Sequence, residues 1–213
     1  MTFSSLLAVD TSTPACSVAF KQHGTVRAEM TLEARRHTDV LLPMCERVLQ
    51  GERPQGIVLS AGPGAFTGLR VGASVALGLA YAWNIPLLTL SSLALLAATA
   101  ANGRDATVLA LLDARMNAVY AGLYRITAGQ LAALATDRLC AAQAIPEEWF
   151  ARADIIAGPG LVYNAPAFTR VPQTLPQALP QAAFAFSWPA EARWQSPSEP
   201  LELFYLRNDV TQS

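Results

Sequence analysis

An aspartate followed by two hydroxyl residues ends the first apolar segment of the chain, residues 5–10. Asp10 is followed directly by Thr11 and Ser12. At the end of a buried strand, a carboxylate with neighbouring hydroxyls can hold a metal ion or orient a phosphate. The same side chains can instead hydrogen-bond to their own backbone in an Asx or ST turn. The local sequence leaves both interpretations open.

A glycine-rich loop, GPGAFTG at residues 62–68, precedes a long apolar helix that we expect over 67–83, with Thr67 as its N-cap. Free N–H groups and the helix dipole make such a junction a candidate anion site. No Gly-Lys-Ser/Thr follows, and the glycine spacing does not match a dinucleotide fingerprint. A tight strand-to-helix turn that needs glycine for packing is the alternative. The candidate cofactor-binding residues are Asp10, Thr11, Ser12, Gly62, Gly64 and Gly68.

Neither the histidines nor the cysteines form a pattern that is typical of a metal or nucleophilic site. His37 precedes a predicted helix, and position i+4, where a second metal ligand would stand, is Leu41. The three cysteines are far apart, and no nucleophile elbow is present. We therefore expect no metal site and no catalytic residue.

The composition is apolar and almost neutral. The 213 residues are 52% hydrophobic and 15% charged, against roughly 25% charged in a typical soluble domain. This surplus suggests that some apolar surface meets another protein. The net charge is −1 and no basic block stands out, which argues against a stand-alone nucleic-acid binder. Three dispersed cysteines suit a reducing, cytoplasmic compartment.

Two features bear on membranes. The N-terminus, MTFSSLLAVD, lacks a basic n-region and reaches an aspartate too early for a signal peptide. Residues 71–102 carry no charge, which is longer than a membrane span requires. The break at Asn84-Ile85-Pro86 falls in the middle of that stretch, so we expect a buried helix–strand–helix segment and no membrane span.

The first half is predicted to be an antiparallel meander followed by alternating helices and short strands, whose strands pair in parallel. In the helix over 38–50, Pro43 is placed in or near the first turn. The predicted elements are strands 5–10, 17–22, 25–33, 57–60 and 86–90, and helices 38–50, 67–83 and 91–102.

The second half repeats the opening of the first. The segment LALLDARMNAVYAGLY is similar to LLAVDTSTPACSVAF, and Asp113 falls at the place of Asp10. Asp113 with Arg115 allows the same interpretations as Asp10, or a local ion pair. We predict a duplicated domain, with chance similarity of two hairpins as the alternative. The predicted elements are strands within 106–125, strand 131–140, helix 144–153, strand 155–160, and a loose helix or loop over 172–200.

We divide the chain into an N-terminal domain over 1–103 and a C-terminal domain over 104–213. Phe204 and Tyr205 suggest that the tail docks on the body of the protein, and we expect the last segment to be a candidate for packing back on the first domain.

Helices 38–50 and 67–83 carry more apolar and small residues than one sheet can cover. In the second helix small residues recur every fourth position, which lets another helix approach closely. These helices form the candidate partner surface, and its residues are Leu41, Leu42, Cys45, Val48, Leu49, Arg70, Gly72, Val75, Ala76, Leu79 and Ala80.

Motifs across nearly the whole chain identify a resemblance. LLAVDTSTPACSVAF, RRHTDVLLP, SAGPGAFTGLRVG, IPLLTLSSL, LLDARMNAVY and the terminal YLRNDV resemble the bacterial TsaB family, also called YeaZ. The resemblance implies an α/β fold of the actin-like and sugar-kinase type, with two ribonuclease-H-like halves of mixed sheets flanked by helices. It also implies a cytoplasmic protein.

The resemblance further implies a role in making threonylcarbamoyladenosine beside the anticodon of tRNAs that read codons beginning with A. There TsaC makes threonylcarbamoyl-AMP, and TsaD, a metal-bearing paralogue, transfers the group to tRNA. This chain would be the non-catalytic subunit that binds and activates TsaD, together with TsaE, meets tRNA only through the complex, and is a homodimer when alone. No cofactor is expected to bind tightly to this chain alone, and ATP or ADP would sit at the interface within the complex.

Two departures concern the second half. Ala118 stands where the family often has Glu, and the C-terminal region is rich in proline. A stand-alone ATP-binding phosphotransferase or ATPase that uses Asp10 and the glycine loop remains the alternative function. The peptidase label given to TsaD relatives is a third reading, and the absence of a histidine pair in the sequence argues against it.

Overall fold

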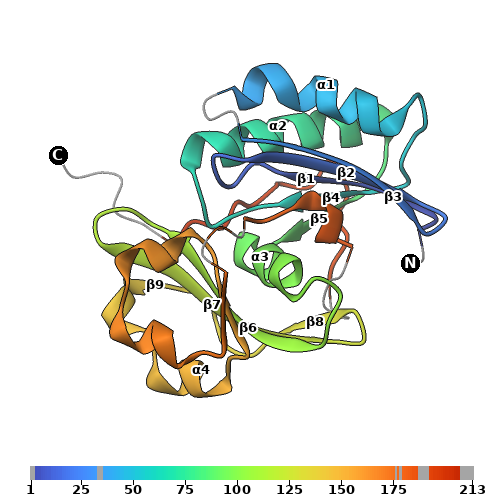
Figure 1. Cartoon of the computed structure of the whole chain (residues 1–213). Helices are drawn as coiled ribbons and strands as arrows, with labels where there is room; N and C mark the ends of the chain where they lie inside the picture. Colours follow the sequence, from blue (N-terminus) through green and yellow to red (C-terminus); the bar gives the residue numbers. More distant parts are fainter. Residues whose placement is uncertain (1–2, 33–35, 176, 178, 187–191, 207–213) are drawn as a thin grey trace.

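Two β-sheets organise the computed structural model, which describes residues 3–32, 36–175, 177, 179–186 and 192–206 (Figure 1). The first sheet has the order β3-β2-β1-β4-β5. β1 pairs antiparallel with β2 and parallel with β4, so the meander and the parallel part share one sheet. Its strands are β1 (Ser5–Asp10), β2 (Cys16–Gln22), β3 (Thr25–Thr31), β4 (Ile57–Ser60) and β5 (Leu87–Leu90).

The two faces of the first sheet have different covers because successive side chains of a strand point to opposite faces. Leu7 of β1 and Leu59 of β4 pack beneath α1 (His37–Leu49) and α2 (Phe66–Trp83). On the opposite face, Val58 packs with Leu95 of α3 (Ser92–Ala101). Figure 1 shows α1 and α2 on one side of this sheet and α3 on the other.

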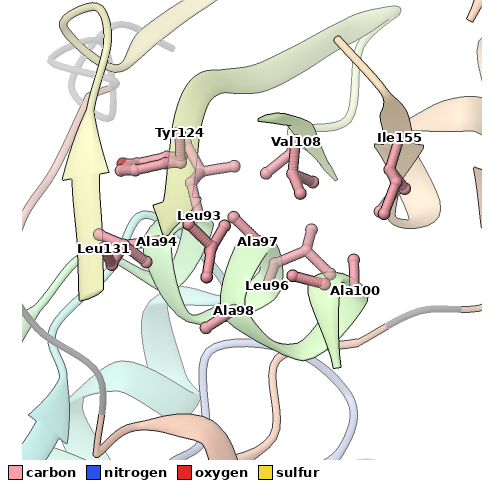
Figure 2. Packing of buried hydrophobic residues seen from close by; sticks show 14 of the residues in the cluster. Leu93, Ala94, Leu96, Ala97, Ala98, Ala100, Val108, Tyr124, Leu131 and Ile155 are labelled. Carbon is pink, nitrogen blue, oxygen red and sulfur yellow. The ribbon is translucent and has the colours of Figure 1, made fainter. Parts of the chain in front are cut away.

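The second sheet has the order β11-β10-β6-β7-β8, and β9 also pairs with β7. α3 covers one face, where Leu93 and Leu96 pack with Val108, Tyr124 and Ile155 (Figure 2). α4 (Glu147–Arg152) and two 3-10 turns cover the other. The strands are β6 (Ala106–Asp113), β7 (Ala118–Thr127), β8 (Gln130–Ala133), β9 (Arg138–Ala141), β10 (Ile155–Ala157) and β11 (Gln173–Leu175).

Four local predictions were wrong. Thr67 lies inside α2, whose N-cap is Ala65, without a side-chain cap. Pro43 lies beyond the first turn of α1. Residues 131–140 form no single strand, because residues 134–137 separate β8 from β9, and each of these two strands pairs with β7. Predicted helix 144–153 is reduced to the six residues of α4, after a 3-10 turn.

The C-terminal segment returns to the first sheet. Leu87 and Gln195 form a β-bridge, and the Phe204 N–H donates to the carbonyl of Ala61 at 2.8 Å. Trp194 lies against Gly56, where an added Cβ would meet its ring. Residues 207–210, the end of the YLRNDV motif, lie outside the described residues. The boundary between residues 103 and 104 remains a prediction, while α3 contributes to cores on both sides of it.

None of the helices in the described part of the chain is both long and apolar enough to cross a membrane.

Candidate functional site

Asp10 closes a turn of its own backbone at the end of β1. Its Oδ1 accepts hydrogen bonds from the Ser12 hydroxyl at 2.7 Å and from the Ser12 N–H at 3.4 Å. Asp10, Thr11 and Ser12 are all buried, and the Asp10 Oδ2 has no hydrogen-bond partner. Burial raises the pKa of Asp10 to about 6, although the nearby Ser60 hydroxyl and the Ser12 hydrogen bonds offset part of the rise. This geometry is the Asx turn that the sequence allowed.

The glycines of the loop bring it against the same turn. A Cβ on Gly64 would lie 2.2 Å from the Ser12 carbonyl oxygen, and one on Gly68 would lie 2.1 Å from that of Thr11. The Ala65 N–H donates to the Ser12 carbonyl at 2.7 Å. The glycines therefore permit two backbone segments to meet, as in a tight strand-to-helix turn that needs glycine for packing. At Gly64 and Gly68 the space that a side chain would need is occupied by the backbone of Ser12 and Thr11.

A cavity of about 480 Å³ lies beside this junction, between the starts of α1 and α2. Gly68 is the one candidate cofactor residue in its lining, which also includes Thr13, His37 and Arg115. His37 is buried and its Nε2 has no hydrogen-bond partner. Asp10 is not among the residues that line this cavity, so the cavity does not unite the six candidate residues, and their role in cofactor binding stays a prediction.

The equivalent aspartate of the second half makes different contacts. Asp113 Oδ1 accepts from the Tyr163 hydroxyl at 2.6 Å and from the Arg115 N–H at 2.8 Å, and a 3.4 Å ion pair joins the Arg115 side chain to Oδ2. The hydrogen bond to Asp113 raises the pKa of Tyr163. Arg115, Met116 and Asn117 all have positive φ angles, which are uncommon for residues other than glycine. This tight turn separates β6 from β7. Among the described residues, no group of three or more histidine, cysteine, aspartate and glutamate side chains is placed to hold a metal ion.

The predicted partner residues divide into two sets. Most of them face the protein's own first sheet, because the apolar stripe of each helix is used in the core. On α2 the small residues fit β1, and a Cβ on Gly72 would lie 2.3 Å from the Thr11 hydroxyl. The buried set is Leu41, Cys45, Val48, Leu49, Gly72, Ala76 and Ala80. The set that reaches the surface is Leu42, Arg70, Val75 and Leu79.

The outer surface of α1 and α2 holds a groove of about 360 Å³. Leu42, Cys45, Leu79 and Trp83 contribute its apolar part, and Leu42 is 52% exposed. Glutamates and an arginine, including Glu46, surround it. An apolar groove with a charged border is typical of a protein contact surface.

Sequence reasoning missed an aromatic group at the start of α2. The Arg70 guanidinium lies 3.8 Å from the centroid of the Phe66 ring, and the centroid of the Tyr205 ring lies 5.7 Å from that of Phe66. Phe66 and Tyr81 are 45% and 72% exposed. Helical spacing alone could have placed Phe66 and Tyr81 on α2. The aromatic residues of the tail predict docking on the body of the protein, but nothing in the sequence indicates that Tyr205 contacts Phe66.

Solved structures resemble this chain over most of its length. YeaZ from Pseudomonas aeruginosa matches with a TM-score of 0.77 and 34% identity, covering 86% of this chain and 89% of that chain. A second structure, described as an uncharacterized protein with similarity to peptidase YEAZ from Pseudomonas aeruginosa, has a TM-score of 0.83 and 32% identity, with 96% and 100% covered. The chain belongs to the TsaB/YeaZ family.

Two further comparisons agree with this family. The family model described as TsaD, tRNA N6-adenosine threonylcarbamoyltransferase, matches residues 25–165. The TsaB/YeaZ likeness also establishes the actin-like, ribonuclease-H-like fold with its mixed sheets and flanking helices.

Curated relatives carry the name tRNA threonylcarbamoyladenosine biosynthesis protein TsaB. The relative from Escherichia coli is 40% identical over 126 residues, which is 56% of this chain and 54% of that protein. The relative from Haemophilus influenzae is 41% identical over 121 residues, with 54% and 51% covered. The chain thus matches about half the length of these curated relatives.

Proposed function

We propose that this TsaB/YeaZ protein is the non-catalytic subunit required for threonylcarbamoyl transfer to the adenosine beside the anticodon of tRNAs that read codons beginning with A. In this proposal it binds and activates the catalytic paralogue TsaD, together with TsaE, in the cytoplasm. The observation that carries the proposal is the likeness to YeaZ structures over 86% and 96% of the chain. The names of the curated relatives supply the pathway.

The partner surface in this proposal is the exposed side of α1 and α2. It consists of Leu42, Arg70, Val75 and Leu79 with the adjoining groove. Half-exposed apolar side chains in a groove with a charged border can be buried by another protein at a gain in free energy. The buried members of the predicted set stabilise the helices on their own sheet and position this surface, and two of them, Cys45 and Leu49, also line the groove.

In this proposal the chain meets tRNA only through the complex with TsaD. A net charge of −1 offers little attraction to a polyanion. We place ATP or ADP at the boundary shared with TsaD and not in the glycine loop, because this loop packs on Thr11 and Ser12 of the same chain.

An arginine on the exposed surface tests the partner assignment. Val75→Arg places a long charged side chain at a half-exposed position of α2, and burying it against an apolar partner would leave its charge unpaired. We expect at least about tenfold weaker capture of purified TsaD. Ala132→Arg, at an exposed position of β8 in the second sheet, is the matched control and should bind like the unmodified chain. Equal binding by both folded variants would contradict the assignment.

A reconstituted modification assay tests the pathway role. With TsaC, TsaD, TsaE, threonine, bicarbonate, ATP and tRNA present, we expect threonylcarbamoyladenosine to form only when this chain is added. Calorimetry with ATP and Mg²⁺ on the chain alone addresses the phosphotransferase alternative, and we expect no tight binding. Full modification without this chain would reject the proposal, whereas magnesium-dependent tight binding would favour the alternative.

A further inference from the structure

Three polar side chains join the two sheets where α3 begins. The Ser91 hydroxyl donates to Asp137 Oδ2 at 2.6 Å, and the Tyr124 hydroxyl donates to Asp137 Oδ1 at 2.5 Å. Ser91 follows β5 of the first sheet, whereas Tyr124 lies on β7 and Asp137 lies between β8 and β9 of the second. We name these three residues the Asp137 cluster. The hydrogen bond between Ser91 and Asp137 connects segments that are 46 residues apart in the sequence.

The space for the carboxylate depends on a glycine of β7. A Cβ on Gly122 would lie 2.4 Å from Asp137 Oδ1 and 2.7 Å from the Tyr124 ring. Any other residue at this position would push the carboxylate away from the hydroxyl that donates to it. The absence of a Cβ at Gly122 therefore leaves room for the Asp137 carboxylate.

The cluster continues into the glycine loop of the first half. Ser91 is the N-cap of α3, and its Oγ accepts from the Leu93 N–H at 3.2 Å. The next residue, Ser92, donates its N–H to the Gly62 carbonyl at 2.7 Å, and its hydroxyl pairs with that of Ser60 at 2.8 Å. Gly62 precedes α2 by only a few residues. An unbroken series of contacts thus connects the β8–β9 turn to the start of α2.

The hydrogen bonds of the cluster compensate for the burial of the Asp137 carboxylate. With both donors in place, the carboxylate of Asp137 has one hydroxyl on each oxygen. Without them, a largely buried carboxylate loses its compensation, which costs more than the hydrogen bonds gain. The groups that act on Asp137 from the neighbouring elements are Ser91 and Tyr124, and burial raises its pKa.

We propose that the Asp137 cluster couples the position of the β8–β9 turn in the second half to the glycine loop and the first turn of α2 in the first half. Movement of the turn would release Ser91, loosen the start of α3, and free the Gly62 carbonyl. This inference concerns the chain alone and does not rest on the proposed function.

Hydrogen exchange followed by mass spectrometry on the full chain tests the coupling. Asp137→Ala should raise the exchange rate about tenfold or more in peptides covering 91–95 and, at a distance, 61–69. Peptides of the β2–β3 hairpin should not change. Asp154→Ala is the matched control, because that carboxylate accepts from the Thr107 N–H at 2.7 Å within the second half. The Asp154→Ala variant should leave the exchange rate of peptides covering 61–69 unchanged.

Gly122→Ala gives the same test with the carboxylate retained, and we expect the same pattern of faster exchange. If Asp137→Ala does not fold, the milder Tyr124→Phe replaces it, with a smaller rise in the same two peptides. The coupling is refuted if a folded variant changes exchange only near residues 91–95 and 134–139. A uniform rise that includes the β2–β3 hairpin also refutes it, since that indicates general destabilisation.

Discussion

At the scale of single residues, the buried turn at Asp10 shows how one side chain can serve structure at a cost in free energy. The carboxylate is fully buried, one oxygen is satisfied by Ser12, and the other has no partner. A charged group in such a place is disfavoured, which explains the direction of its pKa. The aspartate is therefore a titratable part of the core.

The pH dependence of stability follows from that shift. The pKa of Asp10 rises from an ordinary 3.8 to about 6 in the folded chain. The protonated side chain is favoured in the fold, so this contribution is complete below about pH 4 and is lost as the pH rises through about 6. Asp10→Asn should raise the free energy of unfolding at pH 8 by up to about 3 kcal/mol, with no gain at pH 4. Urea titrations at both pH values measure this, and a variant that is less stable at pH 8 would contradict it.

The glycines of α2 provide a second prediction at this scale. Gly68→Ala places a Cβ against the Thr11 carbonyl, which cannot move without moving β1, and should destabilise the chain by about 2–3 kcal/mol. Gly78, in the same helix, has no neighbouring atom within 4 Å of an added Cβ. Gly78→Ala is therefore the control and should stabilise by up to about 1 kcal/mol. Thermal denaturation of both variants measures the two changes in stability. Equal changes would mean that the backbone at Thr11 can shift to accommodate the added Cβ.

At the scale of elements, periodicity predicted where helices and strands lie but not which face each helix turns outward. The sequence predicts that the apolar stripes of helices 38–50 and 67–83 meet a partner, yet Leu41 and Ala76 are buried in the chain itself. An amphipathic pattern reports only that a face is covered, not what covers it. The outward residues Leu42 and Val75 became apparent only with the sheet in place.

Short-range signals were least informative at element ends. Thr67 has the right side chain for an N-cap, but the loop enters α2 two residues earlier because Ala65 bonds to the distant Ser12. The break between β8 and β9 coincides with Asp137, whose contacts lie across the domain. Such interactions between remote segments leave no local trace in the sequence, which is why the Asp137 cluster was not predicted.

The end of α1 carries a testable contact of its own. The Arg27 side chain on β3 donates to the Val48 carbonyl at 2.7 Å and to the Leu49 carbonyl at 3.2 Å, where the helix dipole is negative. Arg27→Met should lower the free energy of unfolding by about 1–2 kcal/mol. Arg47→Met removes an exposed ion pair with Glu29 between the same two elements and should change stability little. Chemical denaturation distinguishes them, and a harmless Arg27→Met would exclude this capping role.

At the scale of the whole molecule, the duplicated pattern around Asp10 and Asp113 led to the right architecture. Each aspartate ends a strand that pairs antiparallel with the next strand. These two strands, β1 and β6, are the first along the sequence in their respective sheets. The two sites have nevertheless diverged, since Asp113 is partly exposed and bound by Tyr163, which lies far along the chain. Internal symmetry predicts a backbone better than it predicts the chemistry of a site.

The exposed groove between α1 and α2 bears on self-association. When TsaD is absent, we propose that a second copy of this chain covers the same surface, giving a homodimer. Light scattering over a range of concentrations should then report twice the mass of 22.7 kDa, falling to the single mass at high dilution. Leu42→Arg should give the single mass throughout, while Ala132→Arg should not. A single mass at all concentrations would contradict the homodimer, and the surface would then bind only other proteins.

All ten residues of α3, from Ser92 to Ala101, are buried, because a sheet lies on either side of it. This helix has no solvent-exposed position at which substitutions would be tolerated. In a saturation mutagenesis library, the segment should therefore form an uninterrupted block of intolerance to charged residues, unlike the alternating tolerance along α1.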